Sequence, residues 1–381
     1  MAQTTMIKAP FNGQLSPSEI FGSIFNMIIS QQVMDPELAD NYSELVGKYK
    51  VDGTLYGDTK LFYATDILQS RPWLNDAEAA NLLNINRPAD PKCQAITIDQ
   101  FRQIDITTDQ YLSKRAWSDE GTFSTFNSII LGLIGQTKKL FETTMFNTYL
   151  GTTEGNAVRS EIEIPLSDIT ATGEEKNRLE AQTIANAIAD LLVDMKDYSR
   201  DFNDYGFMRA YTEDQLVFIW NSAWVNKITK IDLPTIFHKD GLMEKMDQHI
   251  LPARYFGHVS TAADAEAGGA IASNKVVTAG TVRSLVEKTV GTAHYFPGDA
   301  LPVNTTVGGS SAAFLYEEAY IVDDDIICKV VTNDTYKFMS AFETGTNFLN
   351  PRSLSLNTYL TWGYGAPDRL LDQPLVTVHA D

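Results

Sequence analysis

The stretch SDEGTFSTFNSIILGLIGQTKKLFETTMFNTYLG, residues 118–151, carries the longest helical pattern in the chain. Its apolar side chains recur at the three- and four-residue spacing of one face of an α-helix. They are Phe126, Ile129, Ile130, Leu133, Ile134, Leu140, Phe141, Phe146 and Tyr149. The pattern predicts a helix from Asp119 to Leu150, with Gly151 available as its C-terminal cap. At ~1.5 Å per residue this helix would be about 45 Å long, the length of a whole domain.

Before this helix, residues 51–117 alternate apolar and polar side chains, as strands with one polar face do. The alternation is clearest at residues 96–99 and 104–107, and residues 60–68 are the opposing arm. We therefore expect a long two-stranded hairpin that extends from the rest of the fold, with further residues inserted at its tip. A two-stranded hairpin is marginally stable alone in water, so its apolar face needs a neighbour, which another subunit can supply. The candidate intersubunit contacts are Trp73, Leu74, Leu82, Leu83, Ile96, Ile98, Ile104 and Ile106.

The N-terminal residues contain a second amphipathic pattern. Ser16, Pro17 and Glu19 combine a capping serine, a proline at the first helical position and a glutamate three residues after the cap. The apolar residues that follow predict a helix to about Gln32, whose apolar face must dock on another surface.

After residue 151, helix and strand patterns follow one another. Thr172 with Glu175 is a capping signal for a helix whose apolar stripe includes Ile184 and Leu191. Residues 215–220, QLVFIW, form a short apolar run of the kind found in strands buried on both faces, and a helical stretch begins near Ala223. This order predicts a central sheet flanked by helices, and hence an α+β protein.

Small residues dominate residues 257–312, which predicts a loop-rich insertion. From Ala313 onward, FLYEEAYIV, the acidic turn at residues 323–325 and IICKVV predict a hairpin. Further strands are expected near residues 337–342 and 354–362.

Composition limits the classes of protein. With 44% hydrophobic and 21% charged residues among 381, the chain is predicted to fold rather than to be disordered. Its net charge of -19 argues against tight binding to DNA or to anionic membranes, because such binding needs basic surface. The N-terminus does not have the pattern of a secretory signal, so we expect the protein to begin in a cytoplasm.

No motif in the sequence points to catalysis. The five histidines show no zinc spacing, and no nucleotide-binding glycine loop or GxSxG sequence occurs. Asp323, Asp324 and Asp325 supply too few oxygens for a cation cage, so a solvated hairpin tip is the favoured interpretation. We predict no enzyme activity, no catalytic residues, no cofactor and no metal site. A hydrolase whose site is assembled from distant residues remains an alternative.

The order of the predicted elements resembles the major capsid proteins of tailed bacteriophages with the Hong Kong 97-type fold, most of all those of small short-tailed phages (podoviruses). The spine helix of that family is similar to residues 118–151, and its extended loop to residues 51–117. Its axial domain is similar to the segment that contains DYGFMRAYTEDQLVFIWNSAWVNKITKIDLPTIF, and its terminal strands to residues 317–365, including Asn350, Pro351 and Arg352.

The resemblance implies a domain plan. It comprises an N-terminal arm (1–50), an extended loop (51–117), a peripheral domain with the spine helix (118–172), an axial domain (173–312) with an insertion at 257–312, and late strands that return to the peripheral domain with a C-terminal tail (313–381).

The resemblance also implies a structural subunit of an icosahedral virus capsid, assembled in the host cytoplasm and located in the virion. Its partners would be further copies of the same chain in hexamers and pentamers. The resemblance also admits scaffolding, portal and accessory virion proteins as partners. The shell would enclose double-stranded DNA without sequence-specific binding and without a membrane. A bacterial encapsulin-type nanocompartment shell is an alternative within the same fold.

Overall fold

The structure is a computed structural model that describes residues 43–52, 59–68, 70, 87–109, 120–228, 247–259, 270–272, 276–277, 288–290, 293–295, 306–307, 310–311, 313–315, 319–365 and 367–381. The helix predicted for residues 16–32 lies outside these residues. The chain divides into two compact units. Of the described residues, the smaller unit holds 101–109, 120–140 and 342–363, and the larger unit holds the rest.

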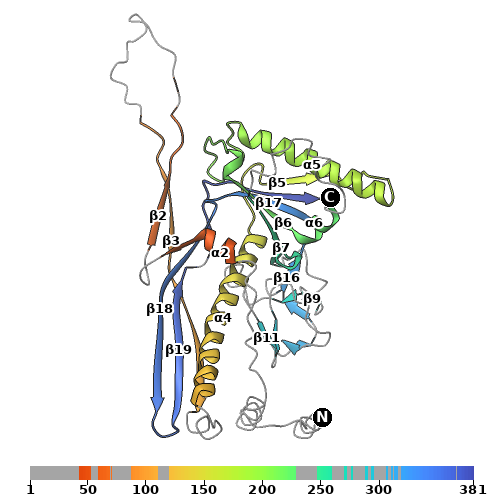
Figure 1. Ribbon diagram of the computed structural model, residues 1–381. Helices are drawn as coiled ribbons and strands as arrows, with labels where there is room; N and C mark the ends of the chain where they lie inside the picture. The colour runs from red at the N-terminus through yellow and green to blue at the C-terminus, as the bar shows by residue number, and fades with distance from the viewer. Residues whose placement is uncertain are drawn as a thin grey trace, which may run out of the picture. The chain divides into compact units, whose positions relative to one another are not determined.

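A five-stranded sheet is the centre of the larger unit (Figure 1). Its strand order is β5 (Glu161–Ile164), β21 (Leu375–Ala380), β17 (Ile326–Thr332), β6 (Leu216–Asn221) and β7 (Asp247–Leu251). β17 is antiparallel to both β21 and β6, whereas β5 and β7 pair in parallel at the two edges. Every residue of β6 and β17 is buried, which confirms that the apolar run at residues 215–220 is a strand covered on both faces.

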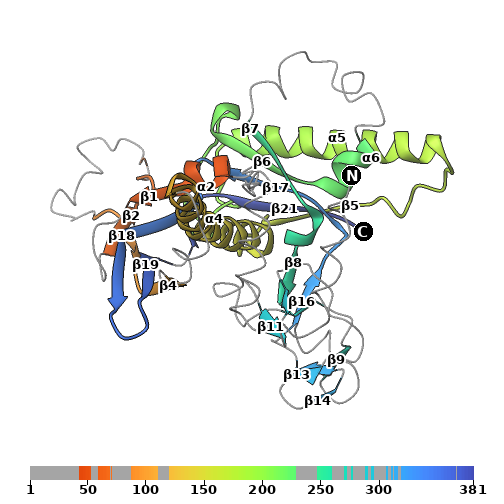
Figure 2. The same ribbon diagram turned by 60° about the horizontal axis from the view of Figure 1, so that its bottom comes forward.

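Helix α5 (Glu174–Lys196) runs alongside this sheet in both views (Figures 1 and 2). Its apolar stripe, which includes Ile184, Ile188 and Leu191, belongs to the same buried cluster as Phe218 of β6 and Val330 of β17. The helix is confirmed but its predicted cap is not. The N-cap is Gly173 at φ 70, without a side-chain capping bond, rather than Thr172. The short helix α6 (Ser222–Ile228) directly follows β6, as expected.

The long helix, α4 (Glu120–Thr152), matches the prediction closely, and its last three turns are buried around Met145, Phe146 and Leu150. Gly151, however, is not a cap, because it lies inside the helix. A Cβ at this position would lie 1.8 Å from the carbonyl oxygen of Tyr255, so glycine is required by the close approach of another backbone. The Tyr255 carbonyl belongs to the 3₁₀ turn η2 (Ala253–Tyr255).

The two arms of the predicted hairpin are β2 (Thr59–Ala64) and β3 (Lys92–Thr97), antiparallel with Lys60 opposite Ile96. The strand predicted around residues 104–107 is β4 (Gln100–Asp109), and it does not extend this hairpin. It joins a second sheet whose order is β1 (Lys50–Asp52), β18 (Tyr336–Asn350), β19 (Ser355–Tyr364) and β4, with β20 (Asp368–Arg369) paired to β18. Periodicity found the strands, whereas their partners depend on residues far away in the sequence.

The acidic turn Asp323–Asp325 was expected to close a hairpin, and this expectation is wrong. The strand before it, β16 (Ala319–Val322), pairs with β8 (Gly257–Val259) and β10 (Val276–Val277), whereas β17 after it enters the central sheet. The turn therefore connects two sheets. The other described strands from residue 257 to 315 are two or three residues long: β9 (Ala270–Ala272), β11 (Lys288–Val290), β12 (Ala293–Tyr295), β13 (Thr306–Val307), β14 (Ser310–Ser311) and β15 (Ala313–Leu315). The remaining elements are α2 (Ser43–Tyr49) and the 3₁₀ turn η1 (Glu213–Gln215).

Candidate functional site

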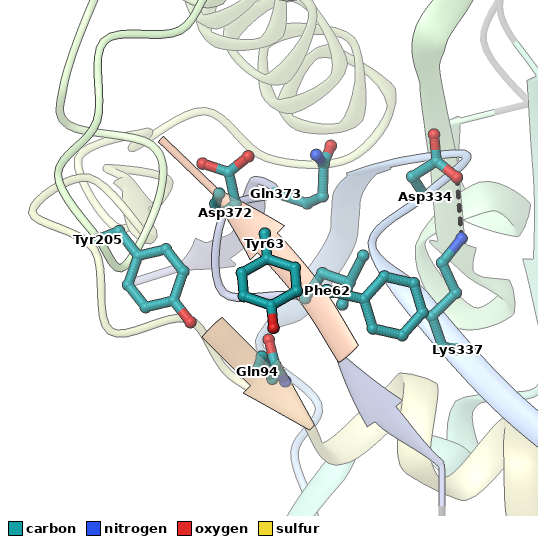
Figure 3. Close-up of a pocket in the computed structure, with 10 residues that line it drawn as sticks. Phe62, Tyr63, Gln94, Tyr205, Asp334, Lys337, Asp372 and Gln373 are labelled. Atoms are coloured by element: carbon teal, nitrogen blue, oxygen red, sulfur yellow. Dashed lines mark hydrogen bonds and ion pairs between the residues drawn. The ribbon is translucent and has the colours of Figure 1, made fainter. Parts of the chain in front are cut away.

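A pocket of about 270 Å³ lies in the larger unit, beside the β2–β3 hairpin (Figure 3). Its walls come from the hairpin, the loop after α5, the start of β18 and the loop between β20 and β21. The lining residues are Phe62, Tyr63, Ala64, Gln94, Tyr205, Asp334, Lys337, Leu370, Asp372 and Gln373. Segments far apart in the sequence therefore build one hollow.

The Gln94 side-chain amide connects the β2–β3 hairpin to the opposite wall of the pocket by two hydrogen bonds. Its Nε2 donates to the carbonyl oxygen of Arg369 at 2.7 Å, and its Oε1 accepts from the backbone N–H of Leu371 at 3.1 Å. The Arg369 guanidinium is itself paired with Asp204, to which its Nη1 donates at 3.1 Å, and both side chains are almost completely buried. Paired hydrogen bonds of this kind hold the pocket walls in one geometry.

Two further ion pairs fix the rim. Arg209 Nη2 donates to Asp372 Oδ1 at 2.8 Å and to the carbonyl oxygen of Thr65 at 2.9 Å, while Asp66 accepts from Arg200 Nη1 at 2.6 Å and from the N–H of Met208 at 3.0 Å. The Met208 hydrogen bond, followed by the Arg200 bond, lowers the pKa of the Asp66 carboxyl. The hairpin is therefore anchored to the loop after α5 by the residues that directly follow β2.

The pocket offers ring faces together with carboxylates. Phe62, Tyr63 and Tyr205 contribute the rings, and Asp372 lines the same pocket (Figure 3). Burial raises the pKa of Asp372 more than Arg209 lowers it. Asp334, by contrast, has a side chain 72% exposed and accepts from Lys337 Nζ at 2.8 Å. Such a lining suits a side chain that is apolar along its length and cationic at its end.

Exposed apolar side chains gather at two other places. On the arm of the β2–β3 hairpin, Leu61, Tyr63 and Leu68 are 53%, 67% and 73% exposed. In the smaller unit, Phe348 and Leu354 flank the turn between β18 and β19 and are 61% and 48% exposed. Clusters of large exposed apolar residues mark surfaces that are covered by a partner.

The described residues contain no group of three or more His, Cys, Asp or Glu side chains placed to hold a metal ion. Among the helices described, none is long and apolar enough to cross a membrane. These findings leave the pocket and the exposed apolar surfaces as the candidate functional features.

Sequence comparison finds no matching family model and no matching characterised protein. Structure comparison does find similar chains. A chain in the capsid structure of Staphylococcus phage Andhra has a TM-score of 0.59 at 11% identity, with 99% of this chain and 91% of that chain covered. A chain in the structure of head fiber and inner core protein gp22 of native bacteriophage P68 has a TM-score of 0.56 at 10% identity, with 98% and 91% covered.

This chain has a phage capsid-protein fold. The similarity extends over nearly the whole of both chains. The capsid-protein fold expected from the order of elements is therefore confirmed at the level of an α+β fold.

Four of the eight predicted contact residues are among those that the structure describes, and they fall in two environments. Ile96 and Ile98 are 3% and 0% exposed and pack against Met339 and Leu370 of the same chain. The apolar face of Ile96 and Ile98 is therefore covered by residues of the same chain, whereas the sequence alone assigned its cover to another subunit. The two side chains are not exposed to a second subunit. Ile104 and Ile106, on β4, are half-buried. Four of the predicted contacts lie outside the described residues: Trp73, Leu74, Leu82 and Leu83.

Sequence reasoning did not single out Leu61, Tyr63, Leu68 or the pocket. The alternation along β2 contained the signal for Leu61 and Tyr63, since residues of one parity had to face outward, whereas Leu68 lies beyond that strand. Which parity faced outward depended on the packing of Phe62 with the Ile96–Ile98 cluster, and local sequence does not reveal that packing.

Proposed function

We propose that this protein is a structural subunit of an icosahedral virus capsid, which self-assembles into the shell around a packaged double-stranded DNA genome. The observation that supports this proposal is the capsid-protein fold over 99% of the chain, at a TM-score of 0.59 to a chain of the Staphylococcus phage Andhra capsid. We assign the fold to the Hong Kong 97 type, with α4 as the spine helix and the β2–β3 hairpin as part of the extended loop.

The surface of the chain supports self-association. Leu61, Tyr63 and Leu68 project from the hairpin, and Phe348 and Leu354 project from the β18–β19 turn. Exposing these side chains to water in an isolated chain costs about 25 cal/mol per Å² of apolar surface, and contact with another copy recovers this free energy. We assign the two surfaces to contacts within and between hexamers and pentamers of the shell.

The charge of the chain is compatible with enclosing DNA. A subunit with net charge -19 does not bind the duplex tightly, so the packed genome can slide along the inner wall. We place the protein in the virion after assembly in the host cytoplasm. Scaffolding, portal and accessory virion proteins are its further partners in this proposal, and a small short-tailed phage is its proposed source.

We assign no enzyme activity. Among the described residues the pocket contains no nucleophile paired with a general base and no metal-binding group. Neither a hydrolase nor a nanocompartment shell has an observation of its own in its favour.

The test is the assembly state of the purified chain. Sedimentation velocity and electron microscopy should reveal large closed particles, alone or after co-expression with the phage partners. A protein that remains monomeric at high concentration under both conditions would refute the proposal.

A further inference from the structure

The turn between β18 and β19 presents one basic side chain at an exposed tip. Residues 351–354 are all exposed, and Leu354 has φ 54, in the left-handed region that is uncommon for leucine. The turn is held by Asn350 Oδ1, which accepts from the N–H of Arg352 at 3.1 Å, and by the Ser353 and Ser355 hydroxyls, whose oxygens are 2.6 Å apart. The tip therefore has a defined shape.

Arg352 has no carboxylate partner within the described part of its own chain. Four of the eight other described arginines pair with a carboxylate of the same chain: Arg159 with Asp194, Arg200 with Asp66, Arg209 with Asp372 and Arg369 with Asp204. An arginine held at a structured tip without an intrachain partner is available to another molecule.

The pocket beside the β2–β3 hairpin has the complementary chemistry. The rings of Tyr63 and Tyr205 provide faces on which a guanidinium can stack. Asp334 accepts one hydrogen bond from Lys337, but its side chain is 72% exposed, so its carboxylate has further lone pairs open to a second donor. At about 270 Å³ the hollow is smaller than the ~300–1,000 Å³ of sites for drug-sized ligands, so it suits one side chain. Its walls are held by the Gln94 and Arg209 hydrogen bonds already described, so binding needs little rearrangement.

Charge favours a second copy as the source of that side chain. Each copy carries net charge -19, so two copies repel one another over most of their surfaces. Contacts between copies must then bring the few available basic groups against acidic ones. Arg352 and Asp334 are such a pair, since both are exposed and the Arg352 guanidinium is unpaired within the described chain.

We propose that Arg352 at the β18–β19 tip of one copy inserts into the aromatic and acidic pocket of a neighbouring copy. Its guanidinium stacks on Tyr63 or Tyr205 and pairs with Asp334, while Leu354 covers the apolar rim. This inference rests on the proposed function, because it names the residues through which two subunits of the shell meet.

The first experiment compares particle yield for wild type, Arg352→Glu and the matched control Arg178→Glu. Arg178 is exposed on α5, so both substitutions change the net charge equally. We expect Arg352→Glu to lower particle yield about tenfold or more and the control to assemble like wild type. Equal yields for Arg352→Glu and wild type overturn the inference. Absence of particles from wild type refutes the proposed function instead.

The second experiment locates the tip directly and keeps Arg352 in place. A photo-crosslinking benzoylphenylalanine replaces Ser353, and isotopically light and heavy chains are co-assembled before irradiation. We expect mixed light–heavy crosslinks from residue 353 to peptides that contain residues 62–64, 334–337 or 370–373. Crosslinks confined to one chain, or directed only to other peptides of the neighbour, overturn the inference even when particles form.

Discussion

Lys329 makes the stability of this protein depend on pH in an unusual direction. It lies on β17, is fully buried, and its Nζ donates to the carbonyl oxygen of Thr153 at 2.8 Å, just after the end of α4. Burial lowers the pKa of the Lys329 ammonium from 10.5 to about 8, although the carboxylates of Glu154 and Asp323 act in the opposite direction. In the native state this lysine therefore loses its proton near physiological pH.

The direction in which stability changes with pH follows from how many protons the native and the unfolded chain bind. Between pH 8 and pH 10.5 the unfolded chain holds a proton on Lys329 that the native chain has lost, so the free energy of unfolding rises with pH. Below pH 8 the charged native lysine costs about 3 kcal/mol, at ~1.4 kcal/mol per pKa unit. From pH 7 to pH 9 the titration of Lys329 alone should increase the free energy of unfolding by about 1 kcal/mol.

Other buried groups set an upper limit to the pH range over which the free energy of unfolding rises. Burial raises the pKa of the Cys328 thiol and of the Tyr49, Tyr211 and Tyr336 hydroxyls. In the unfolded chain these groups ionise from ~pH 8.5–10, and the native state then becomes less stable as pH rises. The increase that Lys329 causes is therefore measurable below about pH 9 and reverses above it.

The assay is urea unfolding of the unassembled chain at pH 7, 8 and 9, for wild type, Lys329→Met and Lys92→Met. Methionine at position 329 removes the group that raises stability with pH, so we expect the free energy of unfolding of Lys329→Met to fall from pH 7 to pH 9 relative to wild type, as Cys328 and the buried tyrosines dictate. Lys92 is exposed on β3, so Lys92→Met should keep the wild-type slope. A slope in Lys329→Met equal to that of wild type would show that the buried lysine has no effect on the pH dependence.

Three further perturbations test the packing and the hairpin. Gly151→Ala should destabilise the chain by about 2–3 kcal/mol, because the new Cβ meets the Tyr255 backbone, whereas Gly135→Ala, with nothing within 4 Å, should stabilise α4 by about 1 kcal/mol. Chemical denaturation separates the two, and equal effects would contradict the close approach. Ile98→Ala, at a fully buried position, should cost about 2–5 kcal/mol in the same assay, and a loss below ~1 kcal/mol would mean that its packing is incidental. Replacement of residues 71–86 by a Gly/Ser linker should leave the thermal transition of the monomer intact, since Asp66 and Ile98 are kept, but abolish particles in electron micrographs; normal particles would rule out the tip as a clasp between subunits.

Local periodicity was sufficient to predict the elements that most define this fold. The 3.6-residue spacing from Phe126 to Tyr149 predicted α4, and the uninterrupted apolar run before Asn221 predicted β6. Both features depend only on side chains within one element, because burial of a continuous face imposes its period on the sequence. The order of these elements also sufficed to indicate a capsid-protein fold.

The tertiary structure alone decided what each element packs against. Gly151 is needed for the approach of the Tyr255 backbone rather than for a cap, and Ile98 is covered by Met339 instead of by a second subunit. Strand pairing, close approach and the side of a strand that faces inward all depend on residues outside the element itself, often far away in the sequence, so no local period encodes them. The pocket and the Arg352 tip emerge only when those distant segments are placed in space, whereas the acidic charge that limits how copies can meet was already fixed by composition.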